Sequence, residues 1–290
     1  RDDVESRGLG DVYKRQRRHC GYAGCLCIHR CHLRLRKAKE MAITVKSARE
    51  IELMRESCKL LADVFQNMER AVKPGMSTMD INILGDKLIR GHGCIPNFLH
   101  YNGYPASICV SVNDEVVHGI PMKHHILQEG DIVSLDAGLI YKGYHSDMAR
   151  TIAVGEVSEE AKLLMERTRQ SFFEGIKYAK DGNHLHDISN AIDAYISQFG
   201  YGIVRDLVGH GIGTALHEDP QIPNFAQKRK GPRLQAGMTL AIEPMINIGR
   251  PDVVWLDDDW TVVTEDGSLS AHYENTILIT DGEPEILTLY

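Results

Sequence analysis

The sequence contains no long hydrophobic run, because nowhere do 18 consecutive residues all carry apolar side chains. A membrane-spanning helix needs about 20 predominantly apolar residues, so no transmembrane segment is expected. A basic start followed by an apolar stretch and a small-residue cleavage site is also missing, which argues against a secretory signal.

Cysteine is scarce beyond residue 40, where only Cys58, Cys94 and Cys109 occur. Three scattered thiols do not make the disulfide framework of a small secreted domain, and they fit a reducing compartment. We therefore expect a cytoplasmic protein.

Positive charge is scarce in the same part of the chain. Residues 41–290 carry 22 Lys and Arg against 35 Asp and Glu. Nucleic-acid binding requires a basic surface, so nucleic acid is excluded as the main partner. The length of 290 residues and the hydrophobic fraction of 43% suffice for a large globular core.

Residues 1–40 differ from the rest of the sequence. They carry 11 Lys and Arg against 5 Asp and Glu, and they hold Cys20, Cys25, Cys27 and Cys31. The spacing C-x₄-C-x-C-x₃-C lacks the paired cysteines of ordinary zinc sites. We predict a basic tail that is disordered or non-native, with a zinc knuckle as the alternative, and a catalytic domain over residues 41–290.

Helix and strand patterns follow one another twice in the same order. The predicted helices span residues 48–72, which follow a capping box at Ser47, and residues 78–90, 158–180 and 184–199. The predicted strands span residues 107–113, 131–140, 145–154, 238–248 and 272–280. This order predicts one α+β domain with two similar halves, about 41–154 and 155–290.

Two aspartates lie on either side of a turn near Tyr141-Lys142-Gly143. A hairpin centred between residues 141 and 142 would make Asp136 and Asp147 direct cross-strand neighbours, and a shift of one residue would leave them diagonal neighbours. Two carboxylates that close repel each other unless one is protonated or a cation lies between them.

Two glutamates and two histidines add to this pair. Glu243 and Glu274 lie in the middle of predicted strands, where an isolated carboxylate is costly to bury. His210 and His217 occur in "DLVGHGIGTALHED", whose glycines make a helix improbable. Two divalent metal ions would balance four carboxylates. Carboxylate-rich ligands with an imidazole are typical of manganese, iron(II) or cobalt sites rather than of sulfur-rich zinc sites.

These residues occur in a context that resembles the type I methionine aminopeptidases. The segments "NDEVVHGIP", "GHGIG", "LHE" and "AIEPM" carry the resemblance, which extends from residue 41 to about residue 290. It implies the pita-bread fold, in which two pseudo-symmetric αβ halves enclose a dinuclear metal site. It also implies removal of the N-terminal methionine from nascent proteins whose second residue is small.

The resemblance further implies a metal-ligand set. Asp147 and Glu274 would bridge the two ions, Asp136 would complete the shell of one ion, and His210 and Glu243 would bind the other. Cobalt, manganese and iron(II) are the expected metals, with zinc and nickel also compatible.

Three residues receive catalytic roles from the same resemblance. A metal-bridging water or hydroxide would attack the scissile carbonyl, and Glu243 would accept its proton. His217 would hydrogen-bond the carbonyl or the oxyanion formed from it. His118 would contact the substrate near the scissile amide.

A pocket for the methionine side chain is expected beside these groups. Its predicted lining is Phe98, Tyr101, Tyr104, Cys109, Leu216 and Trp260, with His118 and His217 at the substrate backbone. Aromatic rings and a thiol suit a thioether. Phe98 and Leu216 stand where bacterial relatives often have cysteine and phenylalanine, a departure that bears on the shape of the pocket.

The resemblance implies nascent polypeptide N-termini as substrates, met at the ribosome, and a monomeric enzyme without a membrane partner. A non-catalytic binding protein on the same fold is one alternative, which the five ligands and the acidic domain disfavour. A proline-directed aminopeptidase or prolidase is the other. Those enzymes usually carry a large N-terminal domain, where this chain has forty residues.

Overall fold

The computed structural model describes residues 43–290, so the predicted tail of residues 1–40 lies outside the described residues. The α-helices of the described part are α2 (Ala48–Ala71), α3 (Thr78–Gly91), α4 (Glu159–Ile176) and α5 (Leu185–Ile196), and the 3₁₀ turns are η1 (Tyr101–Gly103) and η2 (Ser197–Phe199). Within residues 43–290, none of these helices combines the length and the apolar character needed to cross a bilayer.

Most of the strands form one antiparallel sheet. Its main path runs β1 (Ile95–Pro96), β4 (Ile132–Tyr141), β5 (Tyr144–Ala153), β13 (Ser270–Leu278), β9 (Thr239–Ile242), β7 (Gly209–Gly211) and β8 (Glu218–Ile222). Attached to this path are β2 (Cys109–Val112), β6 (Gly202–Ile203), β10 (Met245–Asn247) and β14 (Glu285–Ile286). A smaller sheet contains β11 (Val253–Trp255), β12 (Val262–Thr264) and β3 (Glu115–Val117).

All four predicted helices are present, with small differences at their ends. The predicted capping box at Ser47 is confirmed, since the Ser47 backbone N–H donates to the Glu50 carboxylate at 2.8 Å. The helix predicted to reach residue 180 ends at Ile176, because the amides of Tyr178 and Ala179 bond three residues back in tight turns.

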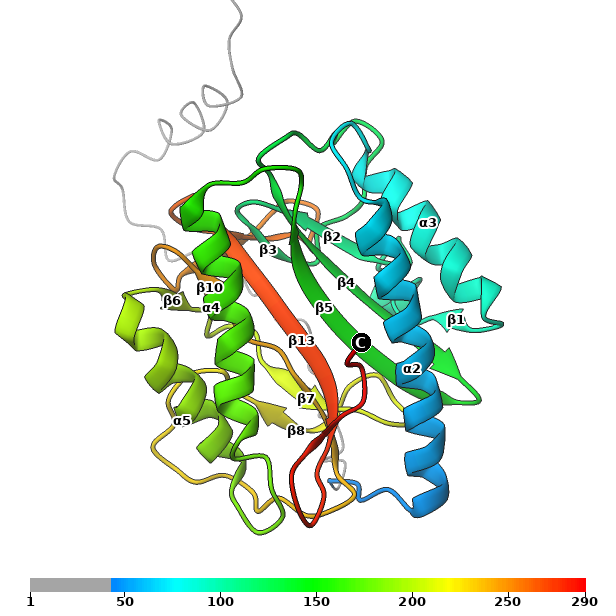
Figure 1. Ribbon diagram of the computed structural model, residues 1–290, viewed down its shortest axis with the longest axis vertical. Helices are drawn as coiled ribbons and strands as arrows, with labels where there is room; N and C mark the ends of the chain where they lie inside the picture. Colours follow the sequence, from blue (N-terminus) through cyan, green and yellow to red (C-terminus); the bar gives the residue numbers. More distant parts are fainter. Residues whose placement is uncertain (1–42) are drawn as a thin grey trace, which may run out of the picture. The chain divides into compact units, whose positions relative to one another are not determined.

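The helices cover one face of the sheet, with α2 and α3 over one half and α4 and α5 over the other (Figure 1). Strand side chains alternate between the two faces. Leu135, Ala137 and Met148 therefore pack with α2 in one core cluster, while Tyr273 and Ile277 pack in a second cluster with α4 and α5. Asp136, Asp147 and Glu274 occupy the intervening positions and point to the face that the helices leave uncovered.

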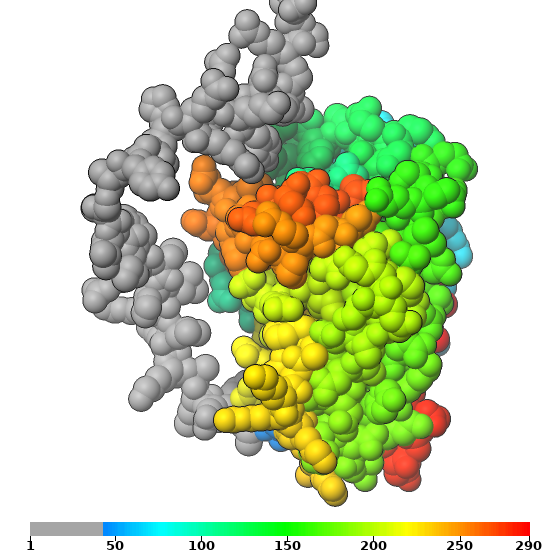
Figure 2. All heavy atoms as spheres, turned by 90° about the vertical axis from the view of Figure 1, so that its left-hand side faces the viewer, coloured from blue at the N-terminus to red at the C-terminus, as the bar shows by residue number. Residues whose placement is uncertain are grey.

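The predicted repetition of two halves is confirmed. The hairpin of β4 and β5 belongs to the first half, β9 and β13 belong to the second, and the antiparallel pairing of β5 with β13 joins them. Figure 2 faces the second half and shows α4 and α5 (green to yellow-green) beside the segment of residues 250–268 (orange).

The hairpin between β4 and β5 differs in register from the direct pairing expected above. Tyr141 pairs with Tyr144, so the turn residues are Lys142 and Gly143, both with positive φ (49° and 85°). Two positive φ values are typical of the type I′ turn, whose twist matches that of the strands. Asp136 consequently lies opposite Ala149, so the direct pairing with Asp147 is wrong, and the diagonal arrangement expected for a turn shifted by one residue is confirmed.

The strand predicted over residues 238–248 is interrupted, so the placement of Glu243 in the middle of a strand is also wrong. β9 ends at Ile242 and β10 begins at Met245. Pro244 has no N–H to donate to the ladder, which explains the break. Both pieces keep the same register with β13, and this register places Glu243 opposite Glu274.

Candidate functional site

The register of the strands places four of the five predicted ligands in two neighbouring rows across the sheet. The fifth, Glu243, lies at the break between β9 and β10. One row runs from Cys109 through Asp136, Ala149 and Glu274 toward Glu243. The next row holds Asp147 and His210, which lie on either side of Thr276 and Ala241. Side chains in both rows point to the same face, so residues far apart in the sequence meet there.

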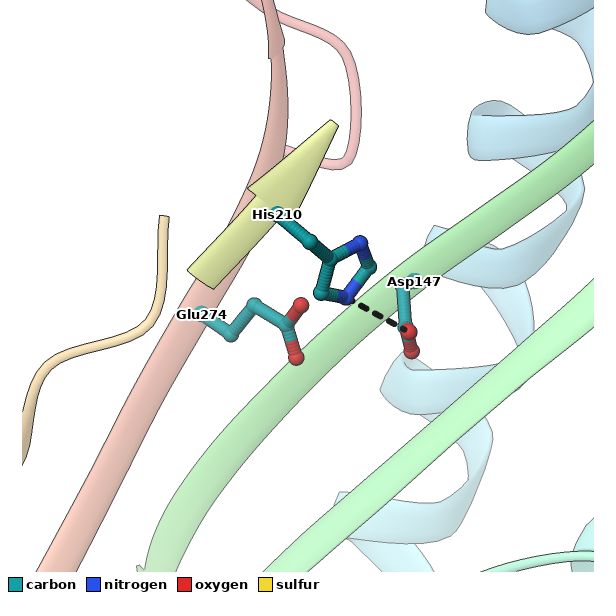
Figure 3. A group of neighbouring side chains, drawn as sticks. All are labelled: Asp147, His210 and Glu274. Atoms are coloured by element: carbon teal, nitrogen blue, oxygen red, sulfur yellow. Dashed lines mark ion pairs between the residues drawn. The ribbon is translucent and has the colours of Figure 1, made fainter. Parts of the chain in front are cut away.

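The side chains of Asp147, His210 and Glu274 point toward one another from three different strands (Figure 3). One ligand atom from each lies within 4.8 Å of the others, a spacing that can hold a metal ion. His210 Nε2 is 3.8 Å from Asp147 Oδ2 and 3.7 Å from Glu243 Oε1. Asp136 lines the same cavity as these four residues.

The carboxylates are suited to bind a cation because they are buried and some of their oxygens lack a hydrogen-bond partner. Asp136 Oδ1, Asp147 Oδ1 and Glu274 Oε1 are buried atoms with no hydrogen-bond partner in the described part of the chain. Burial raises the pKa of Asp136 to about 7 and that of Glu243 to about 8. Burial and the neighbouring carboxylates raise the pKa values of Asp147 and Glu274 well above their ordinary range. A bound divalent cation would remove this electrostatic cost.

The protonation of His210 is set by its backbone contact. Its Nδ1 lies 2.9 Å from the Gly211 carbonyl oxygen, which can only accept, so Nδ1 carries the proton. Burial lowers the pKa of His210 to about 3, and the ring is therefore neutral. A neutral imidazole with Nδ1 protonated presents a free lone pair on Nε2, the atom that faces Asp147 and Glu243.

His210 and His217 lie at the two ends of a turn rather than on one regular element. His210 is in β7, and His217 directly precedes β8. The turn of residues 212–217 brings their ring centroids to 4.2 Å. On its other side, His217 Nδ1 lies 2.8 Å from the Tyr101 hydroxyl. The two rings therefore share one site although a single strand would have separated them.

Every residue predicted for the metal site and the side-chain pocket lines one cavity of about 250 Å³. The predicted residues found there are Phe98, Tyr101, Tyr104, Cys109, His118, Asp136, Asp147, His210, Leu216, His217, Glu243, Trp260 and Glu274. The Tyr104 and Trp260 rings pack edge to face with centroids 5.1 Å apart, and the His118 ring faces Trp260 at 6.3 Å. Carboxylates thus line one part of the cavity, and aromatic rings line another.

Two residues near the cavity escaped the sequence analysis. Asn102 lines it beside Tyr101. His272 is buried with both ring nitrogens unpaired in the described part of the chain, and its Nε2 lies 3.7 Å from Glu243 Oε2. Its position two residues before Glu274 on a strand places both side chains on the same face, a signal present in the sequence.

A second cavity, of about 500 Å³, lies on the helix-covered side between α2, α4 and the sheet. Its buried cation is Arg150, whose guanidinium donates to the carbonyl oxygen of Ala149 at 2.8 Å and to Asn275 Oδ1 at 2.7 Å. The guanidinium also packs over the Tyr273 ring. These contacts make Arg150 a support for β5 and β13 rather than part of the carboxylate site.

Comparison with known proteins agrees with this architecture. The sequence profile of metallopeptidase family M24 matches residues 52–281. Methionine aminopeptidase from Clostridium acetobutylicum is 53% identical over 247 residues, which cover 85% of this chain and 99% of that protein. The structure of methionine aminopeptidase from Thermotoga maritima matches with a TM-score of 0.83 at 44% identity, over 86% of this chain and 100% of the other.

A Xaa-Pro dipeptidase from Bacillus anthracis is also similar, with a TM-score of 0.70 at 25% identity over 86% of this chain and 62% of that one. The expected pita-bread fold is therefore confirmed. Because the family profile covers most of the chain and a methionine aminopeptidase is matched along nearly its whole length, this chain belongs to metallopeptidase family M24 and, within it, to the methionine aminopeptidases.

Proposed function

We propose that this enzyme removes the N-terminal methionine from nascent polypeptides whose second residue is small. The observation that carries the proposal is the single cavity in which buried carboxylates and an imidazole lie beside an aromatic, thiol-containing wall. A peptide could place its first side chain against that wall while its scissile amide meets the polar groups. The similarity to methionine aminopeptidases supports the same activity.

Asp136, Asp147, His210, Glu243 and Glu274 would hold two divalent ions, because four carboxylates balance two such charges and three of them have unpaired buried oxygens. When bound, the metal pair supplies an activated water and polarises the scissile carbonyl. Oxygen-rich ligands with one imidazole suit manganese, iron(II) and cobalt, and they tolerate zinc and nickel.

Side chains around the scissile bond would transfer the proton, stabilise the oxyanion and bind the substrate backbone. Glu243 would take the proton from the attacking water and pass it to the leaving amine. The Tyr101 hydroxyl would donate to His217 Nδ1, so that His217 Nε2 carries the proton and donates to the developing oxyanion. Burial lowers the pKa of His118 to about 4, which leaves a neutral ring available to hydrogen-bond the substrate backbone.

Phe98, Tyr104, Cys109, Leu216 and Trp260 would surround the methionine side chain, with Tyr101 at its edge. Sulfur packs favourably against ring edges, which gives a thioether an advantage over an aliphatic chain of the same length. The substrates would be the N-termini of nascent chains, met at the ribosome by a monomeric enzyme in the cytoplasm. Neither nucleic acid nor a membrane would be its main partner.

Peptide hydrolysis tests this proposal. We expect cleavage of Met-Ala-Ser, loss of that activity with a chelator, and recovery when cobalt, manganese or iron(II) is added. Ala-Pro peptides should not be cleaved. Preferential cleavage of Ala-Pro would favour the proline-directed alternative, and binding of peptides without turnover at any metal concentration would favour a non-catalytic protein.

We expect a chain that starts at Met41 to retain full activity, because every residue assigned to the site lies beyond that position. Steady-state hydrolysis of Met-Ala-Ser by both chains provides the measurement. A large loss on truncation, together with a zinc requirement in the longer chain alone, would support a zinc knuckle in residues 1–40 instead.

A further inference from the structure

The turn of residues 212–217, between β7 and β8, carries two residues of the cavity, Leu216 and His217. Gly213 lies inside it and Gly211 ends the strand before it, and glycine leaves the backbone more freedom than any other residue. Two backbone bonds join the first part of the turn to other segments: the Ile212 amide donates to the Thr239 carbonyl at 3.1 Å, and the Gly213 carbonyl accepts from the His145 amide at 2.8 Å. Within the turn, the Gly213 amide donates to the Ala215 carbonyl at 3.1 Å. Neither of the two bonds to other segments involves the part that contains His217, residues 214–217.

That part is folded around the carboxylate of Glu218, the residue next to His217. Glu218 Oε1 accepts from the Ala215 backbone N–H at 3.2 Å and lies 3.5 Å from the Thr214 hydroxyl. Its other oxygen, Oε2, accepts from Lys46 Nζ at 2.7 Å and from the Thr44 hydroxyl at 2.6 Å. One carboxylate therefore connects the turn to the segment that precedes α2.

This ion pair is buried and packed against the backbone of the turn. The side chains of Lys46 and Glu218 are 5% and 4% exposed. A Cβ at Gly213 would lie 2.6 Å from both Glu218 Oε1 and Lys46 Cε, so any other residue there would require the pair to shift. Lys46 is itself anchored, because its backbone N–H donates to the Gly237 carbonyl at 2.8 Å.

We infer that Lys46 and Glu218 are positioning residues, whose ion pair holds the turn so that His217 faces the scissile carbonyl. The inference rests on the proposed function, since it uses the role given there to His217. Breaking a buried ion pair by removing one partner leaves an uncompensated charge, which the turn relieves by opening. A displacement of about 1 Å at a catalytic group can cost about 10²-fold in rate.

Two variants test the inference: Glu218→Gln, which keeps the length of the side chain, and Lys46→Met, which removes the charged end and shortens the side chain by one atom. We expect kcat for Met-Ala-Ser to fall about 10- to 100-fold with KM and metal content nearly unchanged. The double variant should be no slower than the slower single variant, because it leaves no unpaired charge. Matched controls are Lys162→Met and Glu159→Gln, which break the exposed pair of these residues on α4 and should keep wild-type kcat.

Amide hydrogen exchange supplies a readout independent of activity. We expect faster exchange in residues 212–217 of both test variants and unchanged exchange in α2 and β13. Unchanged kcat and exchange in both variants would overturn the inference, and so would a loss of kcat proportional to a loss of folded protein or of metal. If the wild type and the controls fail to cleave Met-Ala-Ser, the proposed function fails, while exchange in the turn still tests whether the pair holds it.

Discussion

Replacing Asp136 by Asn or Glu274 by Gln is expected to lower kcat/KM at least about 10³-fold and to reduce the bound metal, while the fold stays intact. Each carboxylate has a buried oxygen with no hydrogen-bond partner in the described part of the chain, and an amide cannot supply the charge that a cation requires there. Metal analysis and peptide hydrolysis measure the two losses on the same preparation.

The metal-free proteins provide an internal check on this prediction. Without a cation the buried carboxylates repel one another, so metal-free Asp136→Asn should unfold at a temperature no lower than that of the metal-free wild type. The exposed residue Glu283 offers a control, and Glu283→Gln should keep both metal and activity. Near-normal turnover in Asp136→Asn or in Glu274→Gln would refute the dinuclear site.

The two histidine-to-alanine variants should lose activity for different reasons, one through a lower kcat and the other through weaker metal binding. His217→Ala should keep its metal and its KM but lose about 10²–10³-fold in kcat, the usual effect of removing one oxyanion donor. His210→Ala should weaken metal binding about 10²-fold or more, because its free Nε2 is the proposed ligand atom and its Nδ1 is fixed by the Gly211 carbonyl. Metal stoichiometry and steady-state kinetics across a metal titration separate the two defects.

Excess metal is the decisive condition in that titration. The activity of His210→Ala should rise as metal is added, whereas that of His217→Ala should stay low at every concentration. If His217→Ala loses metal and recovers with excess, the roles given to the two histidines are interchanged. Tyr101→Phe is the matched companion variant, because it removes the hydroxyl that contacts His217 Nδ1 and should lower kcat by a smaller factor than His217→Ala.

The helices and the two halves could be predicted from the sequence because they follow from periodicity. The convergence of the acids is expected from the hairpin around Tyr141-Lys142-Gly143 and from the resemblance, and the structure brings ligand atoms of Asp147, His210 and Glu274 within 4.8 Å of one another. The exact pairing of Asp136 depended on which two residues form the turn, and a one-residue error there changes direct neighbours into diagonal ones.

The strand break and the position of His272 have local signals in the sequence, whereas the partner of Glu218 has none. Pro244 interrupts a strand that apolar residues alone predict as continuous. The pairing of Lys46 with Glu218 joins segments that are distant in the chain. Glu218 belongs to the segment "LHE", but nothing in the sequence marks Lys46 as its partner. His272 belongs to no segment that carries the resemblance, and its closeness to Glu243 follows only once β10 and β13 are paired.

The pairing of β5 with β13 has a consequence for any cleaved form of the protein. Both aspartates come from the half before residue 154, whereas His210, Glu243 and Glu274 come from the half after it. A cut at the exposed residues Gly155 and Glu156, which connect β5 to α4, would separate the two halves of the chain. Neither fragment alone contains all five proposed ligands, so peptide hydrolysis by a nicked chain would report that its two fragments remain associated.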